Sequence, residues 1–162
     1  MATIKLQIDD FEETNYDIIA LNTSLEDYRL AYFINQKLFI NLSKSKNDVF
    51  IQIKSDESYF THFIFEDEKN DICWSLVQNK SQIAISQNSI SNDLFSESYN
   101  NIESTIYLLP EYKKVDFLLK IDNSCNDEYI NEIISKLNEI DKINLVYRLD
   151  KDKIKTKNNL IF

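Results

Sequence analysis

The chain has 162 residues, a formal net charge of −9, no glycine and a single proline, Pro110. Phosphate-cradling loops, dinucleotide fingerprints and nucleophile elbows are built around glycine, so this composition excludes the enzyme classes that depend on them. The negative charge disfavours nucleic acid and anionic membrane as partners, because both are themselves negatively charged.

The length and the hydrophobic fraction of 43% predict a single domain spanning residues 1–162. The first residues lack a basic region followed by an apolar run, and no stretch reaches the roughly 18 apolar residues of a membrane span. The two cysteines, Cys73 and Cys125, have no metal-ligand spacing. We therefore expect a cytoplasmic protein without a signal peptide or a membrane span, whose thiols are reduced.

The first part of the chain predicts two strands and then a helix. Residues 4–8 alternate, and residues 16–23 are apolar enough for a second strand. Ser24 with Asp27 three residues later resembles a capped helix start, and we predict a helix over about 24–37. A short strand is predicted at 38–42. The apolar residues at helical spacing form one broad stripe, which consists of Leu25, Tyr28, Leu30, Ala31, Tyr32, Ile34 and Leu38.

The middle of the chain reads as an antiparallel meander, because short alternating segments are separated by polar turns about ten residues apart. With no glycine available, asparagine and aspartate are expected at positions of positive φ. The longest polar stretch, 89–101, is predicted to be a loop. The predicted strands of this region lie at 48–54, 58–66, 72–78 and 81–87.

The second half repeats the strand–helix–strand order of the first half. Its helix, predicted over about 125–141, has the cleanest amphipathic pattern in the chain. We predict an α+β fold in which an antiparallel or mixed sheet carries both helices on one face. A ferredoxin-like arrangement is one topology that fits, since its two halves are βαβ units. The remaining predicted strands lie at 102–110, 115–121 and 143–149, and a tail follows at 151–162.

The pattern predicts no catalytic residues, no cofactor and no metal site. His62, the single histidine, lacks partners at metal-ligand spacing and is expected to be a packed or surface residue rather than a general base. The basic tail is expected to be a solvated, extended end, with an acidic partner or RNA as the alternative contact. The apolar end is expected to dock on the protein's own fold or, alternatively, on a partner. The tail residues concerned are Lys151, Lys153, Lys155, Lys157, Leu160, Ile161 and Phe162.

The segment around the proline carries the most specific pattern in the sequence. It reads Leu-Pro-Glu-Tyr-Lys-Lys-Val-Asp-Phe over 109–117 and resembles the signature of the IPExxxVDY family of bacterial proteins. Segments 24–35 and 155–162 also resemble that family. The resemblance implies a cytoplasmic bacterial protein and carries over no activity and no catalytic residue.

Physical chemistry gives this segment two main interpretations, beside catalysis by its two acids, Glu111 and Asp116. The first is a rigid bend between strands, in which Pro110 fixes φ and Glu111 and Asp116 bond to backbone N–H groups or to a nearby Lys or Arg. The second is a binding surface made by Glu111, Tyr112 and Asp116. We expect Val115 and Phe117 to face one way and Asp116 the other.

From these patterns we predict a non-enzymatic protein that works through protein–protein contacts, as an adaptor or a homodimer. One alternative is a small-molecule site between sheet and helices that converges on His62, Glu111 or Asp116. The other is RNA association through the tail. The candidate interaction surface consists of Pro110, Glu111, Tyr112, Asp116, Lys153, Lys155, Lys157, Leu160, Ile161 and Phe162.

Overall fold

The structure is a computed structural model that describes residues 15–53, 56–85, 102–124 and 126–162. The predicted strand at 4–8 and the predicted loop at 89–101 lie outside these residues. The helices are α1 (Asp27–Leu38) and α2 (Asp127–Asn138). The strands are β1 (Tyr16–Thr23), β2 (Ser43–Lys44), β3 (Val49–Ile53), β4 (Asp56–Phe60), β5 (His62–Asp67), β6 (Ile72–Gln78), β7 (Lys80–Ile85), β8 (Ile102–Tyr107), β9 (Phe117–Asp122) and β10 (Ile143–Arg148).

A six-stranded sheet with the order β10-β1-β9-β6-β5-β2 forms the centre of the molecule, and every neighbouring pair in it is antiparallel. Strand β1 lies between β9 and β10, which α2 connects, so β9-α2-β10 is a split βαβ unit. The antiparallel sheet with two helices confirms the α+β prediction. Compared with the four strands of a ferredoxin-like arrangement, this sheet has two more, β5 and β6, between β9 and β2.

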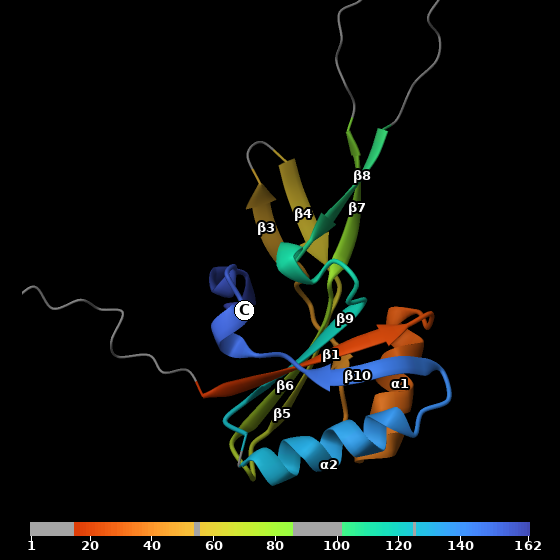
Figure 1. The fold of residues 1–162 in the computed structure, drawn as a ribbon, viewed down its shortest axis with the longest axis vertical. Coiled ribbons are helices and arrows are strands. Elements are labelled where there is room, and N and C mark those ends of the chain that lie inside the picture. The colour runs from red at the N-terminus through yellow and green to blue at the C-terminus, as the bar shows by residue number, and fades with distance from the viewer. Residues whose placement is uncertain (1–14, 54–55, 86–101, 125) are drawn as a thin grey trace, which may run out of the picture.

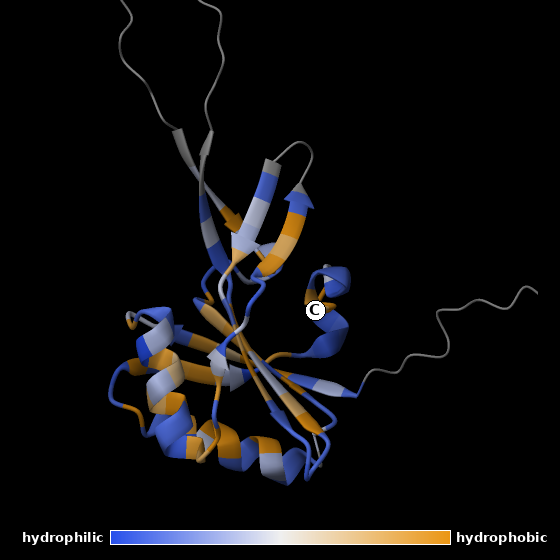
Figure 2. Ribbon diagram, turned by 180° about the vertical axis from the view of Figure 1, so that it is seen from behind, coloured by the Kyte–Doolittle hydropathy of each residue, from blue (hydrophilic) through white to orange (hydrophobic). Residues whose placement is uncertain are grey.

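Both helices pack on the same face of the sheet (Figure 1) and bury one hydrophobic core there. Alternate residues of β1 and β9 point into this core, as the two-residue period of a strand requires. Figure 2 shows the hydrophobic residues concentrated on the central strands and on one side of each helix. This first core contains Ile19, Leu21, Leu30, Ile34, Trp74, Leu76, Leu119, Ile121, Ile130, Ile133 and Leu137.

The opposite face of the central sheet is covered by segments other than the two α-helices. The C-terminal segment and the turn at Pro110 lie on this face, together with the base of two hairpins, β3–β4 and β7–β8 (Figure 1). Because both faces are covered, β1 is buried along nearly its whole length. The second core contains Ile18, Ala20, Val49, Phe60, Val77, Leu108, Leu109, Val115, Leu118, Leu149, Ile154 and Leu160.

Two long strands of the meander leave the central sheet part-way along their length. The predicted strand 58–66 is interrupted at Thr61, which separates β4 from β5, and Asn79 separates β6 from β7. Strands β5 and β6 pair with each other, but beyond these two breaks β4 pairs with β3 and β7 pairs with β8. The two hairpins therefore project from the same end of the sheet (Figure 1).

Several local predictions were wrong at their ends. Helix α1 begins at Asp27 with Glu26 as its N-cap, so Ser24 does not cap it. Helix α2 begins at Asp127, two residues after its predicted start, and is capped by the side chain of Asn126; the nearby Ser124 donates a hydrogen bond to Asp17. Helix α1 ends at Leu38, and apart from Leu38 the predicted strand 38–42 is irregular chain; the two-residue strand β2 follows at Ser43–Lys44.

The apolar stripe of α1 divides into a buried part and an exposed part. Leu30, Ala31 and Ile34 are buried, whereas Tyr28 and Tyr32 are more than half exposed, at 60% and 56%. A tyrosine counts as apolar in a periodic pattern, yet its hydroxyl group is easily left in water. The tyrosines of this helix are therefore surface residues.

Asparagine and aspartate supply positive φ as expected, at Asn123 (58°) and Asp71 (55°). A third position was not expected: Phe39, just after α1, has φ 56° and is almost wholly exposed. A bulky residue in the left-handed region is strained by its Cβ, since this position favours glycine.

Candidate functional site

The turn at Pro110 forms as its sequence dictates. Pro110 begins a short 3₁₀ turn, Pro110–Tyr112, where its missing N–H costs nothing, and Leu109 before it is extended (φ −115°, ψ 94°). Leu108, Leu109 and Val115 are buried in the second core. We call residues 108–116 the Pro110 turn.

Asn79 holds the Pro110 turn in place. Its side-chain oxygen accepts the N–H of Leu109 at 2.9 Å, and its amide donates to the carbonyl oxygens of Tyr112 (2.9 Å) and Val115 (3.0 Å). Its own backbone joins Leu108 and Asp116. Asn79 is fully buried, so these bonds have no competition from water.

Glu111 fastens the C-terminal segment, residues 151–162, which we call the strap. Its carboxylate accepts the N–H groups of Lys155 (2.7 Å) and Thr156 (3.1 Å) and also the hydroxyl of Thr156. Burial alone would raise the pKa of Glu111, but these hydrogen bonds, with one from its own N–H, together lower it.

Asp116 joins the start of β9 to β1 and β7. One carboxylate oxygen accepts the N–H of Thr23 at 3.0 Å, and the other lies 2.5 Å from the ammonium of Lys80. Both acids of the motif thus bond as the rigid-bend interpretation expects. The predicted facing of Val115 and Phe117 was wrong, because Val115 precedes β9 and lies in the second core while Phe117 lies in the first.

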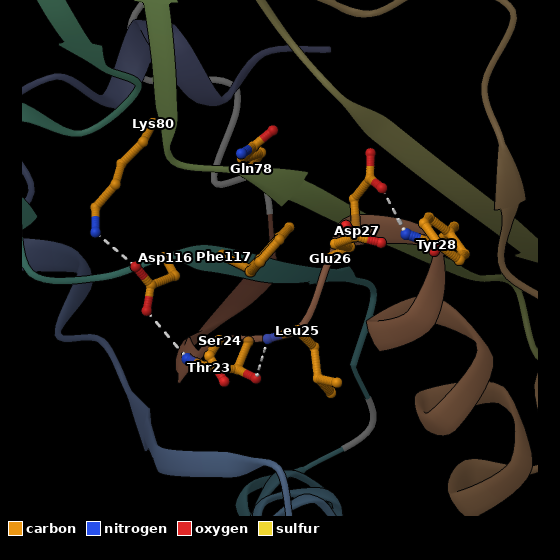
Figure 3. A pocket seen from close by; sticks show the side chains of 10 residues that line it. All are labelled: Thr23, Ser24, Leu25, Glu26, Asp27, Tyr28, Gln78, Lys80, Asp116 and Phe117. Carbon is orange, nitrogen blue, oxygen red and sulfur yellow. Dashed lines mark hydrogen bonds and ion pairs between the residues drawn. The ribbon is translucent and has the colours of Figure 1, made fainter.

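The first cleft lies where β1, α1, β6 and the Pro110 turn meet, and it has a volume of about 530 Å³. Figure 3 shows Lys80, Asp116 and Thr23 linked along one wall, with Glu26, Asp27 and Tyr28 on another. Asp116 is therefore the one residue of the predicted surface that lines this cleft. The lining residues are Thr23, Ser24, Leu25, Glu26, Asp27, Tyr28, Gln78, Lys80, Asp116 and Phe117.

A second cleft, also of about 530 Å³, shares Gln78 and Lys80 with the first. One wall of this cleft is a face of the β7–β8 ribbon. In the register of these strands Lys80 pairs with Tyr107 and Gln82 with Thr105, so these four side chains share that face. Tyr59 of β4 borders the same cleft. We call the two together the joined clefts; the second is lined by Tyr59, Gln78, Lys80, Ser81, Gln82, Thr105 and Tyr107.

Each cleft is lined by a tyrosine that follows a glutamate by two residues. The hydroxyl of Tyr59 donates to Glu57 at 3.2 Å. A hydrogen bond to the Glu26 carboxylate raises the pKa of Tyr28, and the bond to Glu57 raises the pKa of Tyr59 in the same way. Both tyrosines are exposed, so their rings are accessible.

His62 is buried at the start of β5, where its Nε2 has no hydrogen-bond partner. Burial lowers its pKa, and Lys44 and Lys120 add to this effect while Asp48 opposes it. Its ring packs edge-on against Phe162, with 5.2 Å between ring centroids. Neither His62 nor Glu111 lines the first cleft, so the three residues of the small-molecule alternative do not converge there.

The strap differs from the extended tail that the sequence predicts. Two 3₁₀ turns, Lys151–Lys153 and Lys157–Leu160, replace the alternating pattern, so its lysines do not fall on one side. Leu160 is buried, as a docked end requires, whereas Ile161 is 81% exposed. The ammonium of Lys120 lies over the ring of Phe162. Lys153, Lys155 and Lys157 are exposed, and Lys153 pairs with Asp150.

The residues that organise this region were missed by sequence reasoning. Asn79 lies in the short polar break between the predicted strands 72–78 and 81–87. This break is the signal in the sequence that could have identified it. Tyr28 and Tyr59 gave no such signal, since a tyrosine in an apolar pattern fits a core as well as a surface. Among the described residues, no group of three histidine, cysteine or carboxylate side chains is placed to hold a metal ion.

No family model and no solved structure matches the chain. The chain is similar to part of conserved oligomeric Golgi complex subunit 1 from Dictyostelium discoideum, with 38% identity over 71 residues. That stretch is 43% of this chain and 5% of the Golgi subunit. Membership of the IPExxxVDY family therefore stays a prediction. In the described part of the chain, none of the helices has the length and apolar character that a membrane crossing needs.

Proposed function

We propose that this chain is a non-catalytic protein that acts through protein–protein contacts, as an adaptor or as a homodimer, and that the joined clefts are its contact surface. The observation that carries the proposal is the exposure of Tyr28 and Tyr59, at 60% and 55%, at the edges of two clefts that share Lys80. Phe50 extends the aromatic area, with its ring 5.3 Å from that of Tyr59.

Residue chemistry favours a protein partner for this surface. Aromatic side chains are enriched in protein interfaces because they bury a large rigid area at a small cost in conformational entropy. The residues between the tyrosines are polar and able to adapt, namely Gln78, Lys80, Gln82 and Thr105. Anchoring rings around adaptable polar groups are typical of protein-binding sites.

The bonding of the motif acids supports a role without catalysis. The Glu111 carboxylate accepts hydrogen bonds from the strap, and the Asp116 carboxylate accepts one from Thr23 and forms an ion pair with Lys80. A general acid or base needs a proton site that a substrate can reach. The similarity to a protein named as a subunit of an oligomeric complex points toward assembly. We also propose a cytoplasmic location, which fits the thiol of Cys73, since that residue is not in a disulfide.

The test is affinity purification of the tagged full-length protein from its native cell at physiological salt, with mass spectrometry. We expect a stoichiometric partner, or a dimeric mass, that is lost in the double variant Tyr28→Ser/Tyr59→Ser. Tyr32→Ser is the matched control, because Tyr32 is as exposed as Tyr59 but lines neither cleft. A strictly monomeric mass with no partner, or equal losses in both variants, would contradict the proposal.

Two alternatives have narrower support. The first cleft has the volume of a ligand pocket and includes Asp116, which favours a small-molecule site. The exposed Lys155 and Lys157 favour RNA. Because the strap forms part of a core, the RNA alternative is best tested with Lys155→Gln/Lys157→Gln, which should weaken binding and reduce its salt dependence.

A further inference from the structure

A glutamate followed two residues later by an exposed tyrosine occurs twice at the joined clefts. Glu26 with Tyr28 stands at the beginning of α1, and Glu57 with Tyr59 stands on β4. Glu26 and Tyr28 line the same cleft, and the hydroxyl of Tyr59 donates a hydrogen bond to the Glu57 carboxylate, so each pair offers an anionic group and an exposed aromatic ring close together. Glu26 and Tyr28 line the first cleft and Tyr59 lines the second, with Glu57 beside it, and the two clefts meet at Gln78 and Lys80.

The charge of the first cleft is negative. Its lining carries the carboxylates of Glu26, Asp27 and Asp116 and the ammonium of Lys80. Since Asp116 and Lys80 form an ion pair at 2.5 Å, they largely neutralise each other, and Glu26 and Asp27 remain uncompensated within the lining. The net charge of −9 adds a long-range attraction for positive partners.

The protein itself shows that a cation is accepted on this aromatic surface. The ammonium of Lys113 lies 5.9 Å from the ring centroid of Tyr107, which lines the second cleft. Tyr28 and Tyr59 present comparable rings with a carboxylate already beside them. A guanidinium group suits such a place especially well, because it stacks on a ring while it donates hydrogen bonds to a carboxylate.

We propose that the joined clefts bind an extended segment of a partner protein that carries two basic side chains, one at the Glu26–Tyr28 pair and one at the Glu57–Tyr59 pair. This inference rests on the proposed function and adds the chemistry of the partner. The segment lies across the β7–β8 face, where Gln78, Gln82 and Thr105 hydrogen-bond to it between the two anchors. Arginine is preferred to lysine at both anchors.

The test uses the ¹⁵N-labelled full-length chain and a series of serine-based peptides that carry two arginines at increasing separation. We expect one separation to bind best and to shift the amide signals of residues 26–28, 57–59 and 78–82. Matched peptides with two glutamates should not bind. Affinity should fall as salt rises from about 0.05 M to about 0.5 M, because much of the attraction is Coulombic.

Charge variants locate the anchors. Glu26→Gln/Glu57→Gln should weaken the arginine peptide about tenfold, since each carboxylate supplies a charge-assisted hydrogen bond. Glu128→Gln/Glu132→Gln on α2 is the control, because it removes the same charge from exposed residues outside the clefts. Equal weakening in both variants, binding of the glutamate peptides, or shifts confined to other surfaces would overturn the inference.

The two proposals fail in different ways. If no arginine peptide binds while the cellular partner still depends on Tyr28 and Tyr59, the basic segment is wrong and the contact surface stands. If that dependence is also missing, the surface itself is wrong, and the inference fails with it.

Discussion

The side-chain oxygen of Asn79 accepts the backbone N–H of Leu109 at 2.9 Å and so ties the break between β6 and β7 to the residue before the proline. The amide of the same side chain reaches the far end of the turn at Tyr112 and Val115. One buried carboxamide therefore replaces the backbone partners that a sheet would have supplied.

Removing this carboxamide should be costly. In Asn79→Ala, a buried N–H and two carbonyl groups lose a partner, and we expect a loss of about 3 kcal/mol in the free energy of unfolding. Urea denaturation of the wild type and the variant measures this loss in the free energy of unfolding. Asn138→Ala is the control, because the exposed Asn138 makes one local bond to Ile134 and should lose less than about 1 kcal/mol. Similar losses in the two variants would show that the Asn79 bonds contribute little.

The strap should depend on a single carboxylate. Glu111→Ala removes the acceptor for the N–H groups of Lys155 and Thr156. Hydrogen exchange at these two amides should become roughly tenfold to a hundredfold faster, as expected when a charged acceptor is lost. Exchange within β1 should change much less. Unchanged protection at Thr156 would mean that other contacts hold the strap, such as the packing of Ile154 and Leu160 and the bond from Asn159 to Leu108.

Acid should loosen the strap through the same group. The pKa of Glu111 in the folded protein lies below its ordinary value of 4.5, so its contribution is complete above that value. As pH falls through the folded pKa, the carboxylate takes up a proton and the contribution is lost. The protection factors of the Lys155 and Thr156 amides, which are corrected for the slower intrinsic exchange in acid, should therefore fall below about pH 4.5 in the wild type. In Glu111→Gln this fall in protection should be absent; its persistence would point to another group.

His62 should make stability depend on pH in a higher window. Burial holds its folded pKa below the ordinary 6.5, so below that pH the unfolded chain takes up the proton first and stability falls until the folded pKa is passed. His62→Phe removes both the proton site and the unsatisfied Nε2. Urea midpoints between about pH 7.5 and about pH 5.5 should vary less in this variant than in the wild type. Parallel curves would exclude His62 as the cause.

Phe39 should be replaceable with a gain in stability. Its φ of 56° suits glycine, and its ring is almost wholly exposed, so Phe39→Gly should stabilise the protein by about 1 kcal/mol and raise the melting temperature by about 3 °C. Phe39→Ala is the control, since alanine keeps the Cβ that causes the strain. If both variants behave alike, relief of backbone strain is not the reason.

The helices and most of the central strands could be predicted because their signals are local. The apolar run at 16–23 became β1, and the amphipathic pattern around Ile130 and Ile133 became α2. The ends were less predictable, since Ser24 does not cap α1 although serine is a good capping residue, whereas Asn126 does cap α2. The strand expected at 38–42 failed because the chain there leaves α1 through the strained Phe39.

The candidate site was predictable in part. Pro110, Glu111 and Asp116 attracted attention as a motif, and the bonding of both acids follows the rigid-bend interpretation. The roles of Tyr28 and Tyr59 could not be inferred, because periodicity places a tyrosine on a face without saying whether another element covers that face. Coverage depends on residues far away in the sequence.

The sequence by itself determined the α+β class, the two helices, the bend at Pro110 and the exclusion of glycine-dependent motifs. Each of these depends on backbone preferences and on periodicity within a few residues. Tertiary structure decided that Asn79 holds the bend, that Glu111 holds the strap, and that Lys80 joins two clefts into one surface. These are contacts between residues about 30 or more positions apart, and no local pattern encodes which distant groups meet.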